Sequence, residues 1–187
     1  MQNGYLPKVS KFNIFSKFHA GYTRNVPVTS ITIHGSAGGN NAQALFNWWD
    51  SLPTLTDKWS VGKTERMKRA IGFYHYLIDL DGTCFQMLDE FRWAYHSHSG
   101  RMDAGTIAVC LVNTRRENSG SYTDEQYHTL HELITDITTR RPQAKTIYSH
   151  QLRADLYSNL KPPQVTPCPG PEFEWGRLKI FGLSISK

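Results

Sequence analysis

The stretch Gly105-Thr-Ile-Ala-Val-Cys-Leu-Val112 decides the fold of this chain. It is an almost continuous apolar run with several β-branched residues, which is typical of a strand buried on both faces of a sheet. Such strands occur where helices cover both faces of a largely parallel sheet. We therefore expect a central strand here, with the other elements packed around it.

Further strands are expected at residues 28–34, 71–80, 83–88 and 145–149. The first and the last of these end at His34 and His150, where each strand meets a loop. The middle two are separated by Asp81-Gly82, a pair suited to a tight hairpin turn. The sequence therefore predicts one antiparallel hairpin among the strands.

Two amphipathic helices are expected between these strands. One pattern opens at residues 40–42 and ends at Pro53. The other begins with the capping box Thr123-Asp-Glu-Gln126 and reaches Arg141, whose charge suits the C-terminal end of a helix. Strands that alternate with helices predict an α/β fold, a single domain with a central mixed β-sheet flanked by α-helices.

Length and composition agree with one compact domain. The chain has 187 residues, of which 39% are hydrophobic and 12% aromatic, enough to bury a core without disulfide bonds. Residues 1–27 are basic and aromatic without clean periodicity, and we expect them to form an N-terminal arm laid over a domain of residues 28–187. The polar and basic residues 54–69 are expected to form a surface loop.

The balance of 21 Lys and Arg against 16 Asp and Glu gives a net charge of +5. A positive charge favours polyanionic surfaces, such as nucleic acid, acidic membranes or the anionic polymers of bacterial walls. A basic surface that is merely solvated gives the same composition, so the charge does not choose among these partners.

The three cysteines indicate reduced thiols rather than a disulfide framework, because their number is odd and no Cys-x-x-Cys pair is present. Cys84 and Cys110 are expected to be small buried residues. We find no signal peptide at the N-terminus and no transmembrane segment. We expect the protein to be made in a cytoplasm, and to depend on another component to reach any substrate outside the membrane.

His34, His150 and Cys168 are the residues best suited to bind a metal. Each histidine ends a β-branched run, and prolines on both sides of the cysteine give a stiff turn. Two nitrogens and one sulfur suit a catalytic zinc ion, which uses three protein ligands and leaves a fourth position for water. The three residues lie far apart in a sequence with eight histidines, however, and buried packing residues would give the same pattern.

A set of ordered segments carries a resemblance to a known family. The segments are Ile33-His34-Gly-Ser-Ala, Gly72-Phe-Tyr74-His-Tyr-Leu-Ile-Asp-Leu-Asp81-Gly82, Thr106-Ile-Ala-Val-Cys-Leu-Val, Ser149-His150 and Cys168-Pro-Gly-Pro-Glu-Phe-Glu-Trp175. Together they resemble the zinc N-acetylmuramoyl-L-alanine amidases, the family of phage lysozyme-type amidases and peptidoglycan recognition proteins. The resemblance covers residues 28–178.

The resemblance implies a mixed sheet with flanking helices and a zinc ion at the floor of a groove that accepts the peptide stem. It implies that residues 28–187 form a catalytic domain that hydrolyses the amide between the lactyl group of N-acetylmuramic acid and L-alanine. Matched by position, His34, His150 and Cys168 are the ligands of one Zn²⁺ per chain. Tyr74 takes the position of the family's catalytic tyrosine.

The implied role of Tyr74 is chemically reasonable. Zinc polarises a carbonyl and lowers the pKa of water, and a phenol beside it donates a hydrogen bond to the developing oxyanion or orients the water. The alternative is a tyrosine that only packs in an aromatic strand, beside Phe73 and Tyr76.

Two positions depart from the family pattern. Thr166 stands two residues before the cysteine ligand, where phage lysozyme-type relatives carry lysine and the recognition-protein branch carries threonine. As a catalytic residue Thr166 can hydrogen-bond but supplies no positive charge. Cys110 stands where some amidase branches place a glutamate, so the sequence leaves the general base open. Residues 154–163 resemble an inserted loop that borders the groove.

Trp93 and His96 belong to a segment that lines the groove in relatives, and we expect them to contact the substrate. For His96 a purely structural role fits equally well. The other histidines in regular elements, His75, His128 and His131, are expected to pack or to lie at the surface.

We therefore expect a zinc hydrolase that acts on bacterial peptidoglycan, most simply a monomeric phage endolysin that reaches the cell wall after release. The alternatives are a non-catalytic peptidoglycan receptor on the same fold, a cytosolic wall-recycling amidase and a secreted antibacterial amidase. A nucleic-acid-binding or polymerase-regulating protein is suggested by the charge and by lysozyme-type relatives. No recognition helix or stacking motif supports that reading, so no nucleic acid is required.

Overall fold

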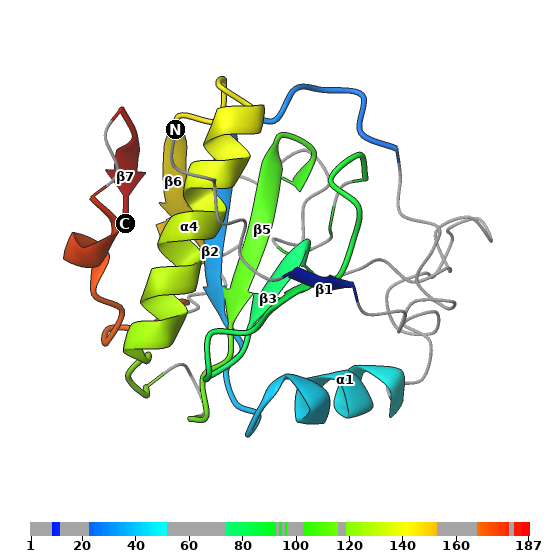
Figure 1. Ribbon diagram of the computed structural model, residues 1–187, viewed down its shortest axis with the longest axis vertical. Coiled ribbons are helices and arrows are strands. Elements are labelled where there is room, and N and C mark those ends of the chain that lie inside the picture. The colour runs from blue at the N-terminus through cyan, green and yellow to red at the C-terminus, as the bar shows by residue number, and fades with distance from the viewer. Residues whose placement is uncertain are drawn as a thin grey trace, which may run out of the picture.

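The computed structural model describes residues 9–11, 23–51, 74–92, 94, 96, 103–115, 119–152, 168–179 and 182–187. The strands are β1 Val9–Lys11, β2 Ser30–Gly35, β3 Tyr76–Ile78, β4 Cys84–Gln86, β5 Thr106–Leu111, β6 Thr146–Ser149 and β7 Ser184–Ser186. The helices are α1 Ala42–Ser51, α4 Asp124–Arg140 and the 3-10 helix η5 Trp175–Leu178. They form the single α/β domain that the sequence predicts (Figure 1).

The strands form one sheet in the order β1-β4-β3-β5-β2-β6-β7. β5 lies between β3 and β2, runs parallel to both and is buried throughout, which confirms the predicted central strand. β3 and β4 pair antiparallel around the turn at Asp81-Gly82, where Gly82 adopts a φ of +80°. The other pairs are parallel, so the sheet is mixed, as predicted.

Helix α4 covers one face of the sheet and crosses β2 and β6 in Figure 1. Its predicted capping box is formed, because Thr123 Oγ1 accepts the N–H of Gln126 and Gln126 Oε1 accepts the N–H of Thr123, both at 3.1 Å. The helix contributes Leu130, Leu133, Ile134 and Ile137 to a core with Ile31, Ile33, Ile107 and Val109. Each buried aliphatic side chain of this size contributes roughly 1.5–3 kcal/mol, so this layer is the main core.

The opposite face of the sheet carries α1 and the polar residues of the candidate site. Asn41 caps α1, because its Oδ1 accepts the N–H of Ala44 at 2.8 Å. A second apolar cluster on this face contains Leu45, Phe46, Leu77, Cys110 and Val112. Since side chains alternate along a strand and Ile33 faces α4, His34 faces this second side.

Of the segment 71–80 that predicted β3, residues 71–73 lie outside the described residues, and within 74–80 the strand covers only Tyr76–Ile78. The carbonyl oxygen of His75 accepts the N–H of both Met87, at 2.8 Å, and Leu88, at 3.3 Å. Two residues of one strand therefore oppose a single residue of the other, as in a β-bulge. Regular pairing begins only at Tyr76, and Tyr74 lies just before it.

Both edges of the sheet hold strands that the sequence analysis did not identify. Val9–Lys11, within the expected arm, pairs with β4, and Ser184–Ser186 pairs with β6. Each is three residues long, too short for an alternating pattern to stand out. The arm as a separate unit with a boundary at residue 28 stays a prediction. The expected loops at 54–69 and 154–163 lie outside the described residues.

Within the described residues, no helix combines the length and the apolar character needed to cross a membrane.

Candidate metal centre

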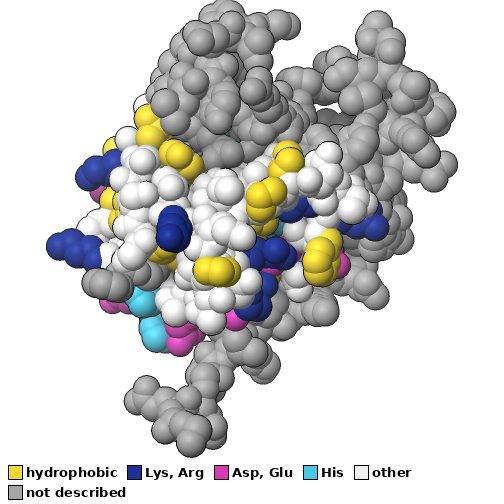
Figure 2. Space-filling model, turned by 90° about the horizontal axis from the view of Figure 1, so that it is seen from above, with side chains coloured by type: hydrophobic (Ala, Val, Ile, Leu, Met, Phe, Trp, Pro, Cys, Tyr) yellow, Lys and Arg dark blue, Asp and Glu magenta, His cyan; other side chains and the backbone are white. Residues whose placement is uncertain are grey.

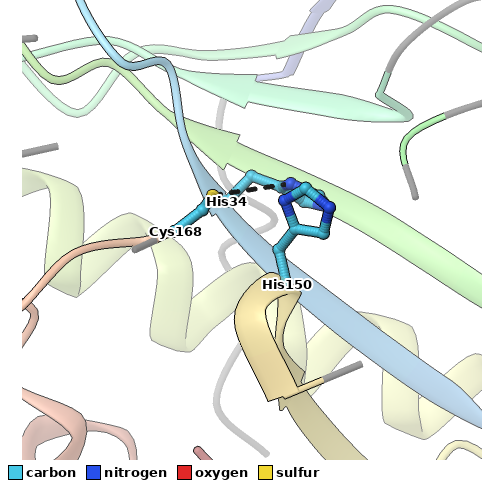
Figure 3. Close-up of side chains that lie close together, drawn as sticks. All are labelled: His34, His150 and Cys168. Carbon is cyan, nitrogen blue, oxygen red and sulfur yellow. Dashed lines mark hydrogen bonds between the residues drawn. The ribbon is translucent and has the colours of Figure 1, made fainter. Parts of the chain in front are cut away.

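His34, His150 and Cys168 come together in space although they lie far apart in the sequence. Their ligand atoms all lie within 4.8 Å of one another. Figure 3 shows them converging from separate elements, His34 from β2, His150 from the turn after β6 and Cys168 from a C-terminal loop. We call these residues the ligand cluster. They are the same three that the sequence predicts as metal ligands.

His34 is buried near the end of β2, beside Cys110 of β5. Its Nδ1 lies 3.7 Å from Cys168 Sγ, and its ring centroid lies 4.4 Å from that of His150. Its Nε2 lies 2.9 Å from Nδ1 of His96. One ring nitrogen therefore faces the ligand cluster, while the other is held by a neighbouring histidine.

His150 begins a short turn that is tied to the cysteine loop. The hydroxyl of Ser149 accepts the N–H of Leu152 at 3.0 Å, which caps the turn. The next residue, Gln151, donates its N–H to the carbonyl oxygen of Cys168 at 3.0 Å. The backbone thus fixes the segment of one ligand against the segment of another.

Cys168 is held by backbone and aromatic contacts. The N–H of Gly35 donates to its Sγ at 3.2 Å, and the hydroxyl of Tyr122 donates to the carbonyl oxygen of Pro169 at 2.6 Å. Phe173 packs against Tyr122 with ring centroids 5.3 Å apart. Burial raises the pKa of the Cys168 thiol to about 12, although the Gly35 N–H acts in the opposite direction. The thiol therefore keeps its proton at neutral pH unless a metal cation displaces it.

The ligand cluster fits zinc better than it fits the hard cations. Zinc accepts imidazole nitrogen and thiolate sulfur, and its catalytic sites use three protein ligands. Magnesium and calcium prefer oxygen ligands, which His34, His150 and Cys168 do not offer through their side chains. The donor atoms brought together here are therefore of the kinds that zinc accepts.

Tyr74 lies beside the ligand cluster. Its ring centroid is 5.0 Å from that of His34, with the planes inclined by 54°. Burial raises the pKa of its phenol well above the usual value, and the neighbouring thiols of Cys110 and Cys168 raise it further. The phenol is therefore neutral at physiological pH and keeps a proton with which it can donate a hydrogen bond.

His96 lies behind His34. It is 6% exposed, and besides its contact with His34 its Nε2 lies 3.2 Å from Asp103 Oδ1, with both side chains fully buried. This last contact lies within ion-pair distance but does not have the geometry of a hydrogen bond. Asp103 was not predicted as a site residue, because nothing in its local spacing distinguishes it from other polar residues before the central strand.

The other residues named from the sequence separate into two groups, the remaining expected site residues and those expected to pack or to lie at the surface. Trp93 and Thr166 lie outside the described residues, so their proposed roles stay predictions. The residues expected to pack or to lie at the surface do so. His75, Cys84 and Cys110 are buried, and His128 and His131 are exposed on α4.

A second polar group is centred on the buried carboxylate of Glu90. Its carboxylate accepts hydrogen bonds from the hydroxyl of Tyr76 at 2.6 Å, from two nitrogens of Arg140 at 2.9 Å and from Nε of Arg141 at 2.7 Å. Burial alone would raise the pKa of Glu90, but the hydrogen bonds from Arg140, Tyr76 and Arg141 outweigh burial and lower it to about 2. We call these four residues the Glu90 cluster. Its carboxylate meets guanidinium groups of the same chain.

A family model described as N-acetylmuramoyl-L-alanine amidase matches residues 24–171. This range contains the whole ligand cluster together with Tyr74, His96 and Asp103. A search of curated proteins gave no match.

Several solved structures share the fold. An endolysin N-acetylmuramoyl-L-alanine amidase from Clostridium intestinale URNW is 18% identical, with 95% of this chain and 96% of that chain covered and a TM-score of 0.62. The Ph2119 endolysin from the Thermus scotoductus MAT2119 bacteriophage is 18% identical, with coverages of 88% and 91% and a TM-score of 0.54. Drosophila peptidoglycan recognition protein SD is 14% identical, with coverages of 88% and 87% and a TM-score of 0.59. At these identities the likeness establishes the fold.

Proposed function

The chain belongs to the N-acetylmuramoyl-L-alanine amidase family, and from that premise we propose that it is a zinc-dependent hydrolase of bacterial peptidoglycan. The bond cleaved is the amide between N-acetylmuramic acid and L-alanine. The observation that carries the proposal is the convergence of two imidazoles and a thiol within 4.8 Å, with a neutral phenol beside them.

Each residue at the site has a distinct role in this proposal. His34, His150 and Cys168 hold the metal, one ion per chain. A bound zinc ion supplies Lewis-acid polarisation of the scissile carbonyl and makes water a better nucleophile near neutral pH. Tyr74 donates a hydrogen bond to the oxygen on which negative charge develops, a role that its raised pKa supports.

Amide hydrolysis then requires one carbon–oxygen bond to form and the carbon–nitrogen bond to break. Water adds to the lactyl carbonyl carbon, and the nitrogen of L-alanine leaves with a proton. Tyr74 stabilises charge in the transition state without losing its own proton. Thr166 is proposed to donate a further hydrogen bond near the site, and Trp93 to line the groove for the substrate.

The endolysin role is a further part of the proposal. Its support is the fold shared with two endolysins, one of them from a bacteriophage. The same fold in a peptidoglycan recognition protein makes binding without cleavage the second candidate. A receptor has no chemical need of a zinc thiolate, so the Cys168 thiol and the adjacent Tyr74 favour the hydrolase.

The positive net charge does not favour nucleic acid as the substrate. Figure 2 shows the face seen from above Figure 1, where Lys and Arg side chains are interspersed with acidic and hydrophobic side chains. A nucleic-acid site usually gathers its basic residues on one face or along one helix. The described part of this face is mixed instead, and a polyanionic wall remains compatible with the charge.

Digestion of purified peptidoglycan, with mass analysis of the products, tests the proposal directly. We expect free stem peptides that begin with L-alanine, together with intact glycan strands, and no such products after treatment with a strong chelator. Shortened glycans would indicate a muramidase, and cut peptides still attached to glycan would indicate an endopeptidase. Retention of the protein on peptidoglycan without any product would favour the receptor.

The endolysin part needs its own measurement, with whole cells in place of purified wall. Added protein should reduce the turbidity of cells whose wall has been made accessible, while a Cys168→Ser sample should not. Cleavage of purified peptidoglycan without any lysis of such cells would leave the amidase in place and remove the endolysin role.

A further inference from the structure

Behind the ligand cluster, His34, His96 and Asp103 form a line of buried polar side chains. The proposed hydrolysis gives His96 and Asp103 no role. His34 Nδ1 faces Cys168, and His34 Nε2 lies 2.9 Å from His96 Nδ1. The far nitrogen of His96 lies 3.2 Å from the carboxylate of Asp103. The line therefore runs from the cysteine through two imidazoles to a carboxylate.

The chemistry of these groups gives the line a direction. An ionised carboxylate only accepts hydrogen bonds, so the Asp103 contact favours a proton on Nε2 of His96. A neutral His96 then presents Nδ1 as an acceptor, and the bond at 2.9 Å requires the proton on Nε2 of His34. The lone pair of His34 is thereby left on Nδ1, the nitrogen that faces Cys168.

We propose that Asp103 and His96 are positioning residues that hold His34 in the tautomer and orientation in which Nδ1 binds the metal. This inference rests on the proposed zinc site. It gives His96 a role different from the substrate contact expected from the sequence, because the side chain is buried and its ring nitrogens meet His34 and Asp103. In this arrangement Asp103 does not touch the metal or the substrate, and it acts on His34 through His96.

Burial makes the arrangement effective. The side chains of His96 and Asp103 are both fully buried, so water does not compete for the contacts between His34, His96 and Asp103. Partners of this kind orient a ligand imidazole and raise its basicity, and their loss typically costs about 10- to 100-fold in metal affinity. His34 has little freedom to find another orientation, because Tyr74, His96 and His150 all surround its ring.

The experiment compares zinc affinity in two variants, each of which neutralises a buried carboxylate. Asp103→Asn acts on the line behind His34, and Glu90→Gln acts on the Glu90 cluster and serves as the matched control. Zinc dissociation constants are measured by chelator competition, and the thermal midpoint of the metal-free protein is measured on the same samples. We expect about 10- to 100-fold weaker zinc binding for Asp103→Asn. Glu90→Gln should lower the thermal midpoint while zinc affinity stays within about twofold of the wild type.

The outcomes separate this inference from the proposed function. If the wild type binds zinc tightly and Asp103→Asn binds it equally well, the positioning role is overturned and the zinc hydrolase stands. Equal losses of zinc affinity in both variants would mean general destabilisation and would also overturn the role. A wild type that does not bind zinc removes the proposed function and the inference with it.

A measurement on the wild type keeps the inference testable even if Asp103→Asn does not fold. Long-range nitrogen–proton correlation spectra of the metal-free protein report which ring nitrogen of each histidine carries the proton. We expect the Nε2–H tautomer for both His34 and His96. A His34 ring protonated on Nδ1 would contradict the proposed direction of the line.

Discussion

The ligand cluster and the Glu90 cluster both place polar groups inside the fold, but the polar groups of the two clusters find different kinds of partner. The Glu90 carboxylate meets two guanidinium groups and a phenol, so opposite charges are matched inside the fold. The ligand cluster brings together imidazole nitrogens and a sulfur, all of which are electron-pair donors toward a metal. Its natural counterpart is a cation from outside the chain.

This difference separates stability from function within one small domain. A buried carboxylate that is paired and hydrogen-bonded stabilises the fold, and loss of a partner is costly. A group of metal ligands does not stabilise the fold in this way by itself. It provides a site at which a metal ion can bind. Substitutions in the two clusters should therefore have opposite profiles, with stability lost in one and zinc or turnover lost in the other.

The largest effect is expected at Cys168. Cys168→Ser removes the soft ligand, so zinc affinity should fall and hydrolysis should cease. The fall should exceed the loss of about 10- to 100-fold that is typical when a residue that orients a metal ligand is removed. Elemental analysis after dialysis measures the bound zinc. The matched controls are Cys84→Ser and Cys110→Ser, which should keep zinc even if packing is weakened. Equal zinc loss in all three variants would show that the ligand assignment is wrong.

Two tyrosines that lie two residues apart, Tyr74 and Tyr76, give the sharpest comparison of the clusters. Tyr74→Phe should lower kcat by about 100-fold or more while zinc content and fold are kept, because the hydroxyl acts only as charge develops on the oxyanion. Tyr76→Phe removes the hydroxyl that donates to Glu90 at 2.6 Å, and it should lower thermal stability while turnover is kept. Turnover, zinc content and thermal midpoint are measured on each sample. Unchanged turnover in Tyr74→Phe would remove this residue from the mechanism.

A stability loss without a zinc loss is expected in the Glu90 cluster. Glu90→Gln should destabilise the fold by about 2–3 kcal/mol, somewhat below the usual cost of breaking a buried pair because Arg140 is partly exposed to water. The control is Asp136→Asn, which removes a partly exposed partner of Arg140 and should cost under about 1 kcal/mol. Urea unfolding of the metal-free protein measures both. Similar losses for the two variants would mean that Glu90 is worth no more than a surface ion pair.

The smallest expected effect is a pH dependence from His75, which lies next to the Glu90 cluster. Burial and then the charge of Arg24 lower its folded-state pKa to about 4, below its unfolded value of about 6.5. The stability from neutral His75 is therefore present above pH 6.5 and is lost as pH falls toward 4. Between pH 7 and pH 5 the metal-free protein should lose on the order of 2 kcal/mol from this group.

His75→Gln tests that assignment, because glutamine can still accept the N–H of Ala108 and donate to the carbonyl oxygen of Arg92 without titrating. Urea unfolding at the two pH values should show a smaller loss in this variant than in the wild type. The same slope in His75→Gln and wild type would assign the pH dependence to other groups.

Much of the fold could be predicted because its signals are local. The apolar run of β5 and the capping box of α4 are each complete within a few residues, so composition and periodicity were enough. The edge strands β1 and β7 were missed because three residues carry almost no periodic signal. The shortening of β3 was missed for a different reason, since the bulge at His75 depends on its partner strand.

The sequence by itself determined which groups were available: the histidines at strand ends, the cysteine between prolines and a central strand to organise them. Only the tertiary structure decided how these groups meet. It placed His96 and Asp103 behind His34, and it joined Glu90 to Arg140 some 50 residues away. The physical reason is that backbone propensity acts over a few residues, whereas the pairing of buried polar groups depends on which side chains the packed sheet and helices bring within hydrogen-bonding distance.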